Sequence, residues 1–242
     1  MVDTTPDDDD HVAIPPSAAR VAARALVLGA VVCRSAIEGD AGNSKAEAFR
    51  EEVLSWLRDV GLVQEAEPSE LELLECKLGG LSDRQRIDAS WRAEGLAVLA
   101  WALRRCDLPV YDRRADPYPI AQALGFRERW RDSVLESPGL RSPEEVSDLA
   151  DVLFTLHWRM RQYSLDRKPM NFREFANTAW FGPLSLMGLR LVSDDLEVRG
   201  VPVWDASEED WREVLSIARE RQQAANWLTG QEMVYSEVTC DT

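Results

Sequence analysis

Apolar residues recur every three or four positions along most of this chain, the spacing that places them on one face of an α-helix. In residues 17–38, for example, Val21, Ala25 and Leu28 follow this spacing, and Gly39 marks the end of the segment. Proline and glycine residues separate the other segments of this kind. The pattern predicts further helices at about 44–60, 69–77, 83–106, 119–124, 127–136, 143–165 and 208–228, with another beginning at Asn171.

Capping residues stand at the expected ends of the long helices. Ser82, Ser142 and Ser207 precede three of them, and a serine hydroxyl can accept a hydrogen bond from the free N–H groups of a first helical turn. Pro143 suits a first helical position, and Gly230 suits the residue after a last turn. The helical spacing of the apolar residues and the capping residues together predict a mainly α, multi-helix globular fold.

Residues 188–203 follow a different period, in which apolar residues such as Leu196 and Val198 alternate with polar ones. Turn signals at Ser193–Asp195 and Arg199–Gly200 interrupt this alternation, and we interpret the acidic residues there as ordinary turn residues. The segment predicts one small β-hairpin or meander near the C-terminal third of the chain.

The chain is expected to form one domain of three parts. Residues 1–15 are predicted to be a disordered acidic leader, because the run Asp7–Asp10 repels itself and has nothing to bury. Residues 16–80 are predicted to form N-terminal helices that pack on the main body, and residues 81–242 a helical core with the small β-element. The 242 residues suffice to bury a core without disulfides or metals.

The chain is strongly acidic, with a formal net charge of −15. Residues 1–80 carry 16 acidic and 7 basic residues, and residues 201–242 carry 9 and 3. Such a chain repels phosphate backbones, so we expect no nucleic-acid partner. The charge suits another protein of basic character, but solubility alone is the explanation that we favour.

No motif in the sequence supports a metal site, a cofactor site, a secretion signal or a membrane helix. The four cysteines form no C-x-x-C pair, so we expect neither a metal nor a cofactor. Phosphate-binding loops, dinucleotide fingerprints and nucleophile elbows are absent from the sequence. The first ten residues do not resemble a secretion signal, and no apolar stretch approaches the ~20 residues of a membrane helix. We therefore expect a cytoplasmic protein without membrane contact.

Three segments and the last two residues of the sequence resemble those of a known protein family. They are residues 91–103 (WRAEGLAVLAWAL), 153–161 (LFTLHWRMR) and 220–230 (ERQQAANWLTG), followed by Asp241 and Thr242. In this order they resemble a bacterial family of domains of unknown function, over roughly residues 80–242, and the N-terminal helices can belong to the same family. The resemblance implies a helical, cytoplasmic bacterial protein and assigns no reaction.

Glu94 is a charged residue on an apolar face, since it shares helical spacing with Trp91 and Val98. A carboxylate in that position is partly desolvated unless it is paired. We favour a structural ion pair with an arginine of a neighbouring helix. The alternative is a general acid or base with a raised pKa.

His157 falls on the face of Leu153, Met160 and Tyr163. We favour a hydrogen-bonded core histidine over a catalytic one, and no second histidine lies near enough in sequence for a metal site. Arg161 follows one turn later, where its guanidinium would disfavour protonation of the imidazole.

Arg221 lies on the apolar face of the last long helix, with Glu220 beside it. A buried arginine requires a carboxylate, and Glu94 is our first choice of partner and Asp241 our second. We hypothesise that five residues meet where three long helices pack: Glu94, His157, Arg161, Glu220 and Arg221. Such a cluster is either an internal clamp, which we favour, or the lining of a site for a small anionic ligand.

The sequence therefore favours a protein-binding or regulatory accessory module, such as an immunity-like protein, over an enzyme. This interpretation depends on the strong acidity, the helical scaffold and the absence of catalytic motifs. The alternative is an enzyme or a small anionic-ligand binder that uses the Glu/His/Arg cluster.

Overall fold

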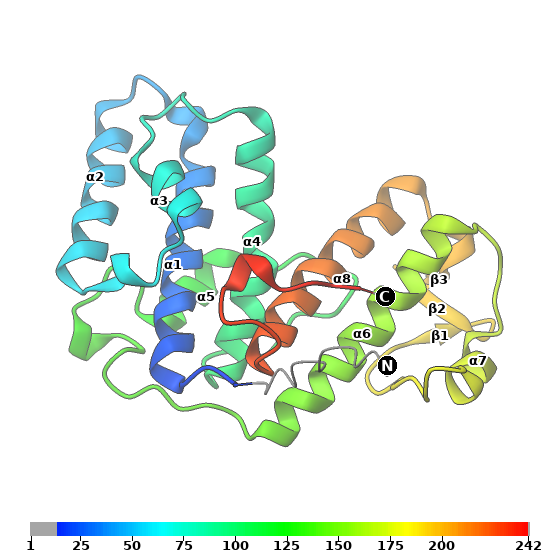
Figure 1. Cartoon of the computed structure of the whole chain (residues 1–242). Helices are drawn as coiled ribbons and strands as arrows, with labels where there is room; N and C mark the ends of the chain where they lie inside the picture. The colour runs from blue at the N-terminus through cyan, green and yellow to red at the C-terminus, as the bar shows by residue number, and fades with distance from the viewer. Residues whose placement is uncertain (1–13, 242) are drawn as a thin grey trace, which may run out of the picture.

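Four long helices lie side by side across the molecule, in the order α1 (Ala18–Ala36), α4 (Asp83–Ala102), α8 (Glu208–Leu228) and α6 (Pro143–Leu165) (Figure 1). The computed structural model describes residues 14–241, so the expected disordered leader lies outside it except for its last two residues. Because α4 and α8 each have a long helix on two sides, the polar side chains that they turn toward these neighbours are withdrawn from water.

Shorter elements cover the two ends of this row. α2 (Ser44–Asp59) and α3 (Pro68–Glu75) pack on α1, and α5 (Pro117–Leu124) packs on both α1 and α4. At the other end, α7 (Phe172–Thr178) contacts a small sheet that also contacts α8. The predicted mainly α fold is confirmed. Among residues 14–241, no helix combines the length and the apolar character that crossing a membrane requires.

The alternating segment forms an antiparallel meander of β1 (Leu191–Val192), β2 (Asp195–Val198) and β3 (Val201–Pro202). In both two-residue turns, Ser193–Asp194 and Arg199–Gly200, each residue has a positive φ. Such turns match the right-handed twist of the strands that they join. The predicted β-element is confirmed in place and in type.

Helix α4 ends at Ala102, four residues before the predicted end at 106. Arg104 has φ 59°, which breaks the helix. The N–H of Arg141 donates to the Ala102 carbonyl (2.8 Å), and the Nε of Arg141 donates to the Trp101 carbonyl (3.0 Å). The last carbonyls of α4 are thus satisfied without another helical turn, and residues 103–116 form an irregular segment, the 103–116 loop.

The predicted helix at 127–136 is wrong, because the segment contains only a single 3₁₀ turn at Trp130–Asp132. Arg127 has φ 66°, which is incompatible with a helix. The carbonyl of Glu128 accepts a hydrogen bond from the indole Nε1 of Trp56 (2.8 Å). A contact distant in sequence therefore supplies the bond that a helix would have formed.

The C-terminal segment, residues 231–241, packs against the helix row, as its apolar residues predict. Tyr235 and Val238 are buried, and Gln223 Nε2 on α8 donates to the Tyr235 carbonyl (3.0 Å). Gly95 on α4 makes room for the tyrosine, because a Cβ atom at this position would collide with the Tyr235 hydroxyl.

We predict that Gly95→Ala lowers the free energy of unfolding by about 1–3 kcal/mol through overpacking. The Tyr235 hydroxyl is buried without a partner among the described residues, so Tyr235→Phe should be neutral or stabilising and should restore much of the loss in the double variant. Urea denaturation measures all three, with Gly139→Ala as a control because nothing lies within 4 Å of its Cβ position. A double variant no more stable than Gly95→Ala would show that this contact is not the cause.

Candidate functional site

Glu94 and Arg221 form an ion pair that is completely withdrawn from solvent, with each residue 0% exposed. The Nε of Arg221 donates to Oε2 of Glu94 (2.9 Å), and Nη2 lies 2.9 Å from the same oxygen. The other carboxylate oxygen, Oε1, accepts the backbone N–H of Ala115 (2.9 Å). Glu94 is therefore the partner of Arg221, in agreement with our first choice.

The remaining donors of Arg221 hold the 103–116 loop. Nη1 donates to the carbonyls of Pro109 (2.8 Å) and Val110 (3.3 Å), and Nη2 donates to that of Arg113 (2.8 Å). Burial lowers the pKa of Arg221, and the Glu94 carboxylate opposes this shift. Because both charged groups are fully bonded to the chain itself, the pair acts as an internal clamp between α4, α8 and the loop.

A second buried pair, Arg159 with Asp195, corrects the interpretation of Asp195 as a turn residue. Both side chains are 0% exposed, and Nε and Nη2 of Arg159 donate to the two carboxylate oxygens at 2.7 and 2.6 Å. The carboxylate also accepts the N–H groups of Met170 (3.1 Å) and Leu196 (2.8 Å). The helical spacing of Arg159 with Leu156 was a signal that could have identified its burial, because both lie on the inner face of α6.

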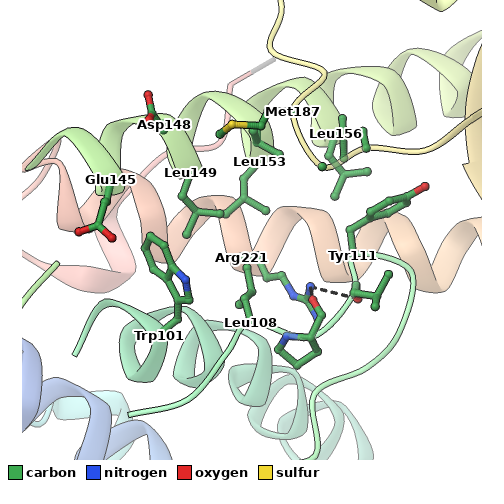
Figure 2. A pocket seen from close by; sticks show the side chains of 15 residues that line it. Trp101, Leu108, Tyr111, Glu145, Asp148, Leu149, Leu153, Leu156, Met187 and Arg221 are labelled. Atoms are coloured by element: carbon green, nitrogen blue, oxygen red, sulfur yellow. Dashed lines mark hydrogen bonds between the residues drawn. The ribbon is translucent and has the colours of Figure 1, made fainter. Parts of the chain in front are cut away.

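An apolar groove of about 480 Å³ lies between α6, the end of α4 and the 103–116 loop (Figure 2). In Figure 2, Leu149 and Leu153 extend from α6 toward Trp101 and Leu108, and Glu145 and Asp148 lie at one end. The rest of the lining is largely apolar: Pro109, Val110, Tyr111, Val152, Leu156, Met187 and Leu189. No local sequence pattern indicates this groove, because its two walls are distant in sequence.

A larger, polar cavity of about 870 Å³ lies between α4, α6, α8 and the C-terminal segment. His157, Arg161 and Glu220 line it, whereas Glu94 does not, and Arg221 lines the apolar groove instead. Glu220 pairs with Arg92 of α4 (3.1 Å). The five residues that we grouped by sequence therefore separate into a sealed pair and a set of three that lines an accessible cavity.

The electrostatics of this cavity follow from burial and from its arginines. Burial lowers the pKa of His157; a hydrogen bond to Gln222 opposes the shift, and Arg161 and Arg219 add to it. Burial raises the pKa of Glu220, which Arg92 counteracts. His157 is therefore a neutral imidazole near neutral pH.

A family model matches residues 4–173, which is more than half of the chain. The chain belongs to the family described as a domain of unknown function (DUF4272). Neither the curated proteins nor the solved structures include a significant match to it. The DUF4272 match includes the N-terminal helices, which we allowed for beside residues 80–242, and it ends before residues 220–230.

The DUF4272 match does not name a chemistry, and the described residues add no metal site to it. Among residues 14–241, no group of three or more His, Cys, Asp or Glu side chains is arranged to hold a metal ion. Two features of residues 14–241 that a ligand can reach are the apolar groove and the polar cavity.

We predict that Arg221→Met destabilises this DUF4272 chain by about 3–5 kcal/mol, because it leaves the Glu94 carboxylate buried and unpaired. Adding Glu94→Leu should recover part of the loss, since the double variant buries no lone charge. The control is Arg219→Met on the exposed side of the same helix, with an expected change within about 0.5 kcal/mol. Equal losses for both single arginine variants in urea denaturation would contradict the clamp.

A second prediction concerns pH. The pKa of His157 is lower in the folded chain than its ordinary value of about 6.5. As pH falls through this value, the imidazole is therefore protonated in the unfolded chain before it is protonated in the folded chain. The contribution of His157 to stability is therefore complete at higher pH and decreases as pH falls toward its folded-state pKa. His157→Gln should remove up to about 1.4 kcal/mol per pH unit from the slope of stability against pH in that window. An unchanged slope would contradict the shift.

Proposed function

We propose that this chain is a protein-binding module whose apolar groove holds an apolar segment of a basic partner protein. The single observation that carries the proposal is the groove itself, an apolar floor with acidic side chains at one end (Figure 2). The regulatory or immunity-like role that the sequence favours belongs to the same class of function.

The floor of the groove supports binding rather than catalysis. Trp101, Leu149 and Leu153 supply apolar contact area, which drives association when it leaves water. Arg221 also lies on the floor, but it is 0% exposed and bonded to Glu94 and to loop carbonyls. It therefore anchors the wall of the groove and offers no free donor to a reacting group.

The charge at the groove end defines the partner. Glu145 is partly neutralised by Arg104 (3.2 Å) and Arg141 (2.8 Å). Asp148 is exposed, and it has no ion-pair partner among residues 14–241. With a net charge of −15 on the chain, a lysine or arginine beside the docked apolar residues is the complementary arrangement.

Exposed apolar side chains border the groove and extend the contact surface. Met187 is 60% exposed and Val110 is 51% exposed, and both belong to its lining. Trp180, which is 91% exposed, precedes Met187 in the connection between α7 and β1. Tryptophan and methionine are enriched in protein interfaces, and exposed apolar patches mark such sites.

The test is selection of a displayed library of random short peptides on the folded protein. We expect enrichment of peptides in which apolar residues adjoin a lysine or arginine. Leu149→Glu should abolish this enrichment because it places a charge on the floor, and Asp148→Lys should reverse the preference for basic flanks. The matched control is Asp166→Lys, the same charge change at an exposed residue beyond the other end of α6.

The site of binding is checked by hydrogen exchange with an enriched peptide. Protection of residues 149–156 and of the 103–116 loop is expected. Identical peptide sets for the wild type, Asp148→Lys and Leu149→Glu would contradict the proposal, as would protection confined to other elements.

A further inference from the structure

The polar cavity has walls from four elements, and each contributes charge. Helix α4 provides Arg84, Asp88 and Arg92, and α6 provides His157 and Arg161. Helix α8 provides Arg219 and Glu220. The C-terminal segment provides Glu237, Cys240 and Asp241. Two ion pairs use part of this set: Arg84 with Asp88 (3.6 Å) and Arg92 with Glu220 (3.1 Å). Among residues 14–241, neither Arg161 nor Arg219 has an ion-pair partner.

These two arginines line the cavity together with His157. Arg161 lies four residues after His157, so both side chains share one face of α6. Arg219 enters the same cavity from α8. Both guanidinium groups act on the imidazole, whereas Glu237 and Asp241 are not among the groups that shift it. The field at this corner of the cavity is therefore positive although the lining as a whole is balanced.

His157 lines the cavity and has one ring nitrogen without a hydrogen-bond partner among residues 14–241. Its side chain is buried, with 4% of the residue exposed, and Nδ1 lies 2.5 Å from Oε1 of Gln222. Because a side-chain oxygen accepts at Nδ1, this nitrogen carries the proton, and Nε2 of the neutral ring has a free lone pair. Nε2 has no hydrogen-bond partner in the part of the chain that the structure describes.

We propose that His157, Arg161 and Arg219 form a binding site for the oxyanion group, carboxylate or phosphate-like, of a small ligand. The two guanidinium groups offer N–H donors, and a proton taken up at Nε2 turns the imidazole into a third donor. Anion binding and protonation of His157 therefore favour each other. The cavity of about 870 Å³ has room for the body of such a molecule.

The acidic residues of the C-terminal segment limit the charge of the ligand. Glu237 and Asp241 line the cavity without an ion-pair partner among the described residues. A second or third anionic group would approach these carboxylates and be repelled. The ligand therefore carries a single oxyanion group, and a polyphosphate is disfavoured.

The experiment follows the imidazole resonances of the full chain by NMR across pH, in sodium sulfate, sodium acetate or sodium chloride at equal ionic strength. The chain has two histidines, and His157→Gln assigns the signals. Sulfate, acetate or both should raise the pKa of His157 with a saturable dependence on concentration, and chloride should not. Preference for sulfate indicates a phosphate-like ligand, and preference for acetate indicates a carboxylate.

Variants of exposed residues separate the site from general screening. Arg161→Gln and Arg219→Gln should each weaken anion binding about tenfold, the loss of one charge-assisted hydrogen bond. Arg84→Gln is the matched control, because Arg84 lines the same cavity but pairs with Asp88. An equal response to chloride, or equal binding by Arg161→Gln, Arg219→Gln and the wild type, overturns the site. Tighter binding of tripolyphosphate than of sulfate overturns the limit of one oxyanion group.

Discussion

Burying a carboxylate and a guanidinium together removes two charges from water, and the loss of hydration is offset only when every donor and acceptor finds a partner. The Glu94–Arg221 pair meets this condition with N–H and carbonyl groups of the 103–116 loop. The hydrogen bonds within the loop are those of turns, such as the bond from the N–H of Arg113 to the Val110 carbonyl (3.1 Å), and the pair supplies further bonds. Since the loop forms one wall of the apolar groove, the shape of the groove depends on a pair that is withdrawn from solvent.

Other irregular segments are held in the same way. Asp195, paired with Arg159, accepts the backbone N–H groups of Met170, between α6 and α7, and of Leu196 in the sheet. Arg34 donates to the carbonyls of Cys76 and Lys77, and Arg50 donates to those of Leu74 and Glu75. A guanidinium has five donors in a planar fork, so one side chain can satisfy several carbonyls that a loop leaves free. Buried arginines thus substitute for secondary structure where the helix row needs connections.

Sequence patterns could predict those elements of the fold that depend on interactions between residues close in sequence. Period and caps located the long helices, and alternation located the meander, because these signals act within a few residues. The end of α4 and the segment 127–136 were predicted wrongly, since Arg141 and Trp56 supply hydrogen bonds from distant positions. Asp195 was missed for the same reason: its partner, Arg159, lies 36 residues away.

The predicted polar cluster separates because adjacent helical residues point about 100° apart. Glu220 and Arg221 are neighbours in sequence, yet one faces Arg92 at the polar cavity and the other faces Glu94 in the interior. A charged residue on an apolar face can thus mean two different things. Where every polar atom has a partner in the chain, as in Arg221, the charge serves the fold. Where a buried ring keeps a nitrogen free beside arginines that have no ion-pair partner among residues 14–241, as in His157, the unused bonding capacity belongs to the lining of a cavity. It is there that a ligand can add an interaction that the described part of the chain does not make.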